Sequence, residues 1–205
     1  MFRHAIALIL SLAATPSFAT QEYILPTLFD LTGVAEGDVL NIRAAPDASS
    51  SILGGIFPGA TRIEVIEERG GWGRVNTGER AGWVNMRYLK YRTDVWEDGT
   101  LPDSLSCFGT EPFWSLAADG DAMVMSTSGE AERRFENATI LGRGVFRDPT
   151  RAVAADGLVT TMIPQICSDG MSDRLFGLRA ELVLTGDRPR LLSGCCTIQP
   201  QPQSD

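Results

Sequence analysis

The stretch Asp38-Val39-Leu40-Asn41-Ile42-Arg43-Ala44-Ala45-Pro46 decides how the first half of this chain folds. Leu40 and Ile42 point to one side and the polar residues between them to the other, the alternation of a half-buried β-strand. Residues 63–65 repeat this pattern. Short turn-forming segments rich in Gly, Pro, Asp and Ser lie between the apolar runs, at residues 46–49, 57–59, 69–71 and 77–79. Several short strands at such close spacing predict a small β-barrel.

Two further stretches complete this region: Gly71-Trp72-Gly73-Arg74-Val75 and Gly82-Trp83-Val84-Asn85-Met86-Arg87-Tyr88-Leu89. With the L-N-I-R-x-x-P opening they stand in the order found in the bacterial SH3 domain, which residues 23–91 resemble. The resemblance implies an SH3-like barrel. It also implies contact with peptidoglycan or an envelope protein, because that family is associated mostly with cell-wall peptides and glycans in bacteria. Many of its members serve only as spacers or docking modules.

The N-terminus predicts export. Residues 1–19 combine a basic start, a short apolar run from Ala5 to Ala14, and small residues at the cleavage positions Ser17-Phe18-Ala19, as in a secretory signal peptide. The apolar run is too short to span a bilayer, and nothing downstream reaches membrane-spanning length. We therefore expect a periplasmic or secreted protein with no integral membrane segment.

Composition argues against several functions. Without the signal peptide, 17 basic side chains face 26 acidic ones, a formal charge of −9, which disfavours nucleic acid and anionic lipid as partners. The mature chain also has no histidine, because His4 is the only one. This excludes Ser-His-Asp and Cys-His catalysis in their usual forms and removes the commonest zinc ligand. We expect no enzyme activity, no cofactor and no metal.

Strand parity predicts a binding platform in the barrel. If Val75 faces the core, Trp72 and Arg74 share the outer face, where an aromatic ring beside a cation could bind a ligand. By resemblance to the SH3 ligand groove, Asn85 and Tyr88 flank this platform, while Val84 is core. Packing of Trp72 against a loop is the alternative.

Two other tryptophans are expected to be structural. Trp83 lies in the last strand, where its ring would cover one end of the barrel. Trp96 falls in residues 92–104, which have no periodicity and read as a linker. There it packs on a neighbouring domain or, as the alternative, stacks on a ligand.

The second half also reads as β-strands. Asp119-Gly120 and Asp156-Gly157 are turn signals between apolar runs, and residues 178–184 alternate before the turn at 186–189. No run of useful length has helical periodicity. The chain is therefore expected to be all-β, with the SH3-like barrel followed by a second antiparallel barrel or sandwich.

This second half resembles a family of largely uncharacterised bacterial envelope proteins, which carry a G-x-E-P-F-W box, a C-x-D-x-M-S box and a late Gly-Cys. Glu111 and Asp169 lie in the two boxes, where a carboxylate pair could act on a glycosidic bond or, alternatively, form turns. Phe113 and Trp114 could line a ligand pocket or enter the core. The family supplies no activity, so the role of these four residues is unknown.

Four cysteines in an exported protein predict disulfides rather than zinc, since they lack paired C-x-x-C spacing. A Cys195–Cys196 bond would need a strained vicinal ring, which leaves two possible pairings. The resemblance favours one of them, because the cysteine of the C-x-D-x-M-S box and that of the Gly-Cys pair occur together in the family. It implies Cys167–Cys195 and hence Cys107–Cys196.

The sequence thus predicts a five-part organisation: a signal peptide (1–19), an SH3-like barrel (20–91), a linker (92–104), a disulfide-bonded β domain (105–198) and a disordered tail (199–205). We expect a non-enzymatic binding or docking module that contacts peptidoglycan or an envelope protein through the barrel. The alternatives are an accessory or inhibitor of cell-wall hydrolases acting through the second domain, and a small-ligand carrier using the interior of that domain. The sequence leaves the oligomeric state open.

Overall fold

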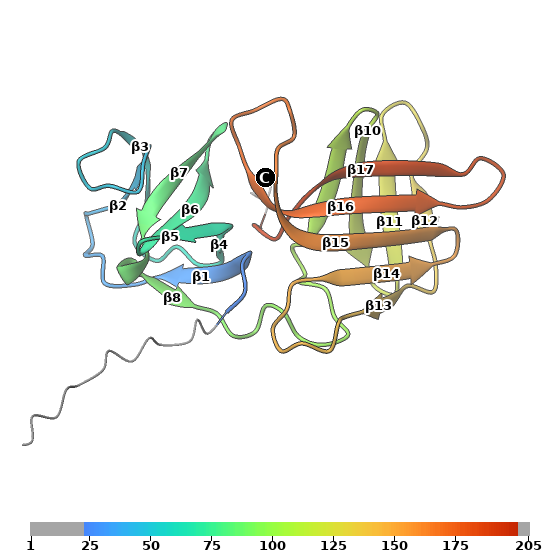
Figure 1. Cartoon of the computed structure of the whole chain (residues 1–205), viewed down its shortest axis with the longest axis horizontal. Helices are drawn as coiled ribbons and strands as arrows, with labels where there is room; N and C mark the ends of the chain where they lie inside the picture. Colours follow the sequence, from blue (N-terminus) through green and yellow to red (C-terminus); the bar gives the residue numbers. More distant parts are fainter. Residues whose placement is uncertain (1–22, 201–205) are drawn as a thin grey trace, which may run out of the picture.

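A computed structural model describes residues 23–200 and shows a chain folded almost entirely into antiparallel β-strands (Figure 1), which confirms the all-β fold class. In this range the only helical segment is η1 (Met86–Tyr88), a single 3₁₀ turn. No helix of the described residues is long and apolar enough to cross a membrane. The predicted signal peptide and residues 201–205 of the tail lie outside the described range.

The first half forms the N-terminal barrel from two sheets. A three-stranded sheet has the order β4-β1-β8, and a five-stranded sheet has the order β3-β2-β7-β6-β5. The strands are β1 (Thr27–Leu31), β2 (Leu40–Arg43), β3 (Ile52–Ile56), β4 (Ile63–Val65), β5 (Glu67–Arg69), β6 (Trp72–Thr77), β7 (Arg80–Asn85) and β8 (Leu89–Tyr91).

The alternating apolar residues of the strands form the barrel core, as the sequence predicts. The inward residues of the strands are buried together: Phe29, Leu40, Ile42, Ile63, Val65, Val75, Val84 and Leu89. Gly73 and Gly82 sit among them because neighbouring atoms already occupy the space that a side chain would need. A Cβ on Gly73 would lie 2.3 Å from the sulfur of Met86, and one on Gly82 would lie 2.5 Å from a methyl group of Ile42.

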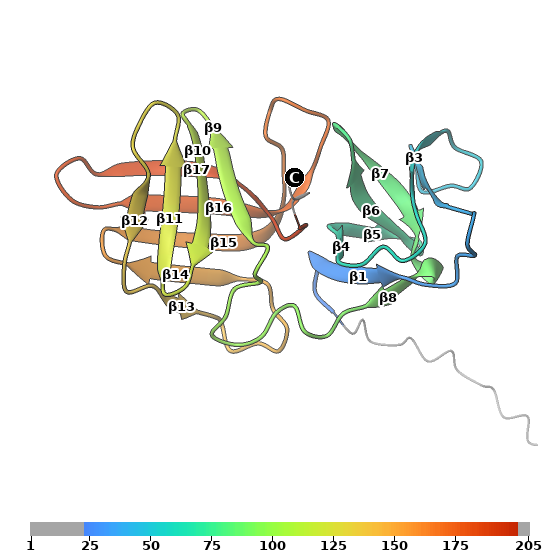
Figure 2. The ribbon, with the colours of Figure 1, turned by 180° about the vertical axis from the view of Figure 1, so that it is seen from behind.

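The second half forms one curled sheet, the C-terminal sheet, with the strand order β12-β11-β10-β9-β17-β16-β15-β14-β13. In Figures 1 and 2, β9–β11 cross β14–β17 steeply on the opposite side of the core. The turns at Asp119-Gly120 and Asp156-Gly157 connect adjacent strands. The strands are β9 (Ser106–Thr110), β10 (Phe113–Asp119), β11 (Ala122–Thr127), β12 (Arg133–Phe135), β13 (Thr139–Leu141), β14 (Arg151–Ala155), β15 (Leu158–Cys167), β16 (Phe176–Leu184) and β17 (Arg190–Thr197).

Two disulfides fix this sheet, Cys107–Cys196 and Cys167–Cys195. These are the pairs that the family resemblance implies. Cys107 of β9 and Cys196 of β17 are directly opposite in register, so the first disulfide joins two neighbouring strands of the sheet, which are its first and last along the chain. Neighbouring residues of a strand point to opposite faces, and Cys195 therefore reaches a different partner from Cys196.

The connection between the halves, residues 92–104, has no regular secondary structure but is firmly held. Trp96 is 4% exposed, packs in the core of the C-terminal sheet, and donates its indole N–H to the carbonyl of Pro26 at 2.8 Å. Arg151 of β14 lies over the Trp96 ring and donates hydrogen bonds to the backbone carbonyls of Glu97 and Thr100, which follow Trp96 in the chain. Trp96 is thus a packing residue between the two halves, not a stacking surface for a ligand.

The two halves also meet through the loop between β15 and β16. Asp173 exchanges backbone hydrogen bonds with Glu79 and Ala81 at the β6–β7 turn. The side-chain amide of Asn76 both donates to and accepts from the backbone of Leu175, at 2.7 and 3.1 Å. The C-x-D-x-M-S box therefore leads into a loop that docks on the N-terminal barrel.

A third junction contact buries a carboxylate. Glu64 points away from the barrel core, as its parity predicts, yet it is only 4% exposed because the end of β17 covers it. Its carboxylate accepts hydrogen bonds from the Thr197 hydroxyl and the Ile198 N–H, and its own N–H donates to the side chain of Gln199. The described chain thus continues in contact with the barrel past residue 198, where the sequence places the start of a disordered tail.

Candidate functional site

The N-terminal barrel carries a surface hollow of about 460 Å³, here called the Trp72 hollow. Three of the four residues of the predicted platform line it, namely Trp72, Asn85 and Tyr88. The rest of the wall comes from the connection between β1 and β2, from β2 and from the turn after it, with Gly33, Val34, Ala35, Asp38, Val39, Leu40, Asn41, Arg43 and Ala48.

Local structure places the three predicted residues side by side. Trp72 of β6 and Asn85 of β7 are directly opposite in register, so their side chains share the outer face. The Asn85 side chain accepts a hydrogen bond from the backbone N–H of Arg87 at 3.1 Å and thereby caps η1. That turn carries Tyr88 into the hollow. Trp72 and Tyr88 are both half-buried, which leaves part of each ring open to a ligand.

Arg74 does not belong to the hollow. It shares the outer face with Trp72, but its guanidinium lies over the ring of Trp83, 5.0 Å from the ring centroid, and pairs with Glu67 at 2.9 Å. The reason is register, because Arg74 is directly opposite Trp83 on one side and Glu67 on the other. The cation beside the hollow is Arg43 instead, which donates to the Ser50 carbonyl at 2.7 Å.

Trp83 is buried as expected, at 4% exposure, but it does not cover one end of the barrel. Val84 and Gly82 face the core, so the Trp83 ring lies on the outer face of the five-stranded sheet. The guanidinium groups of Arg69 and Arg74 cover the ring, at 5.3 and 5.0 Å from its centroid. It is therefore a structural residue that stacks beneath cations.

Sequence reasoning missed Asn41, Arg43 and the connection between β1 and β2 as parts of the site. The signal for the first two was present, because they occupy the polar positions of the L-N-I-R stretch whose apolar positions form the core. Nothing local marks Gly33 to Ala35 as neighbours of Tyr88. That proximity arises only when β1 pairs with β8 and brings the two segments together.

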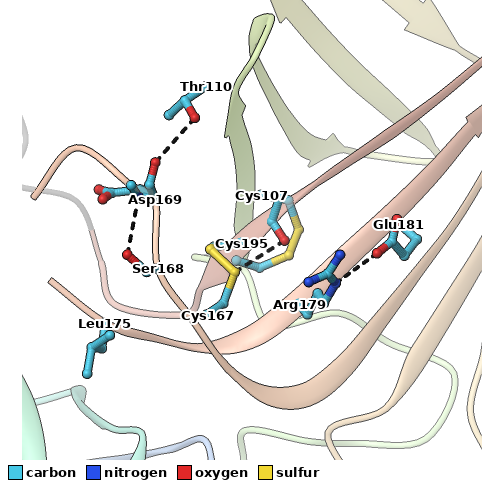
Figure 3. The surroundings of a disulfide bond; sticks show 12 residues. Cys107, Thr110, Cys167, Ser168, Asp169, Leu175, Arg179, Glu181 and Cys195 are labelled. Atoms are coloured by element: carbon cyan, nitrogen blue, oxygen red, sulfur yellow. Dashed lines mark hydrogen bonds and ion pairs between the residues drawn. A yellow bond between two sulfur atoms is a disulfide. The ribbon is translucent and has the colours of Figure 1, made fainter.

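Glu111 and Asp169 line a second hollow, of about 310 Å³, beside the Cys167–Cys195 disulfide. Figure 3 shows Asp169 between Thr110 and this disulfide, and the Thr110 hydroxyl donates to its backbone carbonyl. The Asp169 carboxylate accepts hydrogen bonds from the N–H groups of Met171 and Ser172 and from the Ser172 hydroxyl, at 2.9–3.0 Å. These hydrogen bonds outweigh partial burial, which acts in the opposite direction, and hold the pKa of Asp169 below its ordinary value.

This arrangement gives Asp169 a structural role. An ionised carboxylate that is fully used in closing its own loop is poorly suited to general acid chemistry, which needs a raised pKa. Glu111 is exposed at the rim of the same hollow. The loop that Asp169 stabilises is the one that docks on Asn76, so the box serves the junction.

Phe113 and Trp114 lie in different environments, one exposed and the other buried. Trp114 is 4% exposed and packs in the core of the C-terminal sheet, where Gly109 and Gly194 leave room for its indole. Phe113 is 53% exposed and borders a shallow surface with Met171. The interior of the sheet is filled by Trp96, Trp114, Phe135, three methionines and the surrounding leucines.

All four cysteines are in disulfides. Between Tyr23 and Pro200, no group of three or more His, Cys, Asp or Glu side chains is placed to hold a metal ion.

The model of the family described as "Bacterial SH3 domain" matches residues 38–90, about a quarter of the chain. The match starts just before β2 and ends in β8, so it includes Trp72, Asn85 and Tyr88. No curated protein and no solved structure matches this chain. The resemblance of the second half to envelope proteins therefore stays a prediction.

Proposed function

We propose that this protein is an exported, non-enzymatic binding module of the bacterial envelope, which contacts peptidoglycan or an envelope protein through the Trp72 hollow. The match to the bacterial SH3 domain supports a cell-wall or peptidoglycan-binding role. The two disulfides are compatible with an extracytoplasmic location.

The observation that carries this proposal is the placement of the hollow. The junction uses Pro26, Glu64, Asn76 and the β6–β7 turn, none of which lines the hollow. Figure 1 shows β2 and β3 on the side of the barrel away from the C-terminal sheet. The second half therefore holds the barrel without covering the Trp72 hollow.

The chemistry of the hollow suits a short peptide or glycan. Half-buried aromatic rings stack on sugar faces and on peptide groups, and amide and guanidinium groups beside them fix orientation. Here the rings are Trp72 and Tyr88, the amide is Asn41, and Asp38 and Arg43 contribute one charge of each sign. A ligand with both carboxylate and amine groups would find a partner for each.

The rival functions have less support. An enzyme or inhibitor acting through the second half would need reactive groups, yet the Asp169 carboxylate is occupied by its own loop. A carrier would need an empty interior, and the inward side chains of the C-terminal sheet pack against one another. We therefore assign to the second half the role of holding and orienting the barrel.

Co-sedimentation with purified sacculi tests the proposal. The protein should sediment with sacculi, and Trp72→Ala should lower the bound fraction at least about fivefold, as for a central aromatic contact. Phe146→Ala is the matched control, because Phe146 is 79% exposed in the second half and should be neutral. Circular dichroism verifies that each variant is folded.

Failure to sediment would exclude peptidoglycan as the ligand, and normal binding by Trp72→Ala would exclude the hollow. Muramidase and amidase assays on the same sacculi should show no turnover. Release of soluble fragments would contradict the non-enzymatic assignment.

A further inference from the structure

A larger hollow, of about 650 Å³, lies where the two halves meet and shares no residue with the Trp72 hollow. We call it the junction groove. Most of its wall comes from the N-terminal barrel, and Arg174, Gln199 and Pro200 close it from the other half. The barrel residues are Ile42, residues 55–61, Ile63, Glu64 and residues 75–78.

One side of the junction groove is apolar. Phe57 is 71% exposed although it directly follows β3, and Ile56 and Pro58 flank it. Ile63 and Val75 of the barrel core also reach the groove. Such a wall offers an apolar side chain a place out of water.

The part of the wall that the second half supplies carries a cation, Arg174, whose backbone is fixed. Arg174 lies between Asp173, which bonds to the β6–β7 turn, and Leu175, which bonds to Asn76. Because these hydrogen bonds hold the residues on both sides of Arg174, its backbone stays beside the groove. Its guanidinium lies over Phe176 at 5.2 Å from the ring centroid, and its Nε is buried without a hydrogen-bond partner among residues 23–200.

The positive charge of Arg174 acts on two acids, Glu64 and Asp169, but no ion pair joins it to either of them within residues 23–200. The Glu64 carboxylate accepts hydrogen bonds from Thr197 and Ile198, and the Asp169 carboxylate accepts them from Met171 and Ser172. Because the Nε is closed to solvent, a ligand would contact the terminal nitrogens of the Arg174 guanidinium, and a carboxylate is the group that matches their forked geometry.

We propose that the junction groove binds a short extended peptide segment in which a carboxylate contacts Arg174 and a neighbouring apolar side chain contacts Phe57. A volume of this size holds a few residues of peptide. A polyanion such as nucleic acid fits poorly, since the lining of the groove includes a single cationic side chain and the chain has excess negative charge. This site is independent of the Trp72 hollow, and binding at either one does not require the other.

Two peptides that differ by one atom type test the proposal: acetyl-Leu-Asp-Leu-amide and acetyl-Leu-Asn-Leu-amide, titrated into the ¹⁵N-labelled full chain. The Asp peptide should shift the amide resonances of Phe57, Gly78 and Arg174 in a saturable manner. The Asn peptide should bind at least tenfold more weakly. Equal affinity, or shifts confined to other regions, would overturn the proposal.

Single substitutions test the Arg174 contact and the Phe57 contact one at a time. Arg174→Gln should lose at least tenfold in affinity for the Asp peptide and should bind the two peptides alike, while Phe57→Ala should weaken both. Arg188→Gln, in the exposed turn between β16 and β17, is the matched control and should change nothing. If Arg174→Gln still prefers the Asp peptide, Arg174 is not the recognition group.

The chain itself offers a competing occupant, because Pro200 lines the groove and residues 201–205 follow it. A variant that ends at Pro200 should bind the Asp peptide as the parent does. If only that variant binds, the groove belongs to the chain's own tail and an external peptide is not its ligand. Sacculus binding through Trp72 serves as the readout that the groove variants must leave unchanged.

Discussion

The Glu64 carboxylate in β4 accepts a hydrogen bond from the hydroxyl of Thr197 at the end of β17, 133 positions further along the chain. The contact joins the N-terminal barrel to the last strand of the C-terminal sheet. Burial raises the pKa of Glu64 to about 7, against an ordinary value of 4.5, although the hydrogen bonds from Thr197 and Ile198 and the charge of Arg174 act in the opposite direction. A proton on Glu64 thus favours the closed junction.

The first prediction follows from this raised pKa. Folded Glu64 keeps its proton up to a higher pH than in the unfolded chain, where it is released above about pH 4.5. The stability that comes from this difference is therefore fully present below about pH 4.5 and is lost as the pH rises through 7. The melting temperature should be higher at pH 5 than at pH 8. Glu64→Gln mimics the protonated form, and at pH 8 it should raise the free energy of unfolding by at most roughly 3 kcal/mol.

Thermal unfolding between pH 5 and pH 8 checks this. The carboxyl groups with lowered pKa values, such as Asp148 and Asp169, titrate below this window and do not interfere. Glu36→Gln, at an exposed loop position, should keep the pH dependence of the parent. If Glu64→Gln keeps it too, Glu64 is not the group responsible.

The second prediction concerns two tryptophans on the same outer face. Trp83→Ala should lower the free energy of unfolding by about 3–5 kcal/mol, because it removes a buried ring and uncovers the stems of Arg69 and Arg74. Trp72→Ala, in the neighbouring strand, should cost clearly less since that ring is half-exposed. Urea unfolding of both variants measures the difference, and equal losses would show that Trp83 is peripheral.

The third prediction concerns Arg151, which is 3% exposed and donates to the carbonyls of Glu97, Thr100, Asp148 and Thr150. Arg151→Met leaves these carbonyls without their donor and should lower the free energy of unfolding by about 2–4 kcal/mol. Arg151→Lys should be intermediate, because one ammonium group cannot reproduce the planar fork.

Limited proteolysis should also find residues 92–104 more accessible in Arg151→Met than in the parent. Arg188→Met, exposed in a turn, should behave as the parent does. An unchanged cleavage rate would mean that Trp96 alone holds the connection.

The fourth prediction compares the two disulfides. Replacing Cys107 and Cys196 with Ser opens a loop of 89 residues and should cost about 4–5 kcal/mol on the chain-entropy argument. Replacing Cys167 and Cys195 opens one of 28 residues and should cost about 3–4 kcal/mol. Only the second pair borders the loop that docks on the barrel.

Hydrogen exchange separates the two effects. The Cys167/Cys195 variant should exchange faster at residues 168–175 and at the β6–β7 turn, whereas the Cys107/Cys196 variant should not under conditions where both stay folded. Faster exchange at this loop in both variants, or in neither, would contradict a local role for Cys167–Cys195.

Much of the architecture could be predicted from the sequence because the relevant signals are local. A strand has a period of two, so the alternation around Leu40, Ile42, Val75 and Val84 predicts the core face of the N-terminal barrel even when the pairing of the strands is unknown. Asp-Gly pairs likewise predict the turns. The position of Trp72 on the outer face, with Asn85 and Tyr88 beside it, follows from the same parity together with the family resemblance.

The tertiary structure alone decided what depends on register and on contacts between distant segments. Arg74 turns to Trp83 and Glu67 because those residues stand opposite it, and Arg43 takes its place beside the hollow. Parity correctly placed Glu64 away from the barrel core, but could not reveal that β17 would bury it. The docking of Leu175 on Asn76 spans 99 positions. No periodicity encodes such pairings, because they form only when strands take their register and the two separately patterned halves bury their remaining surfaces against each other.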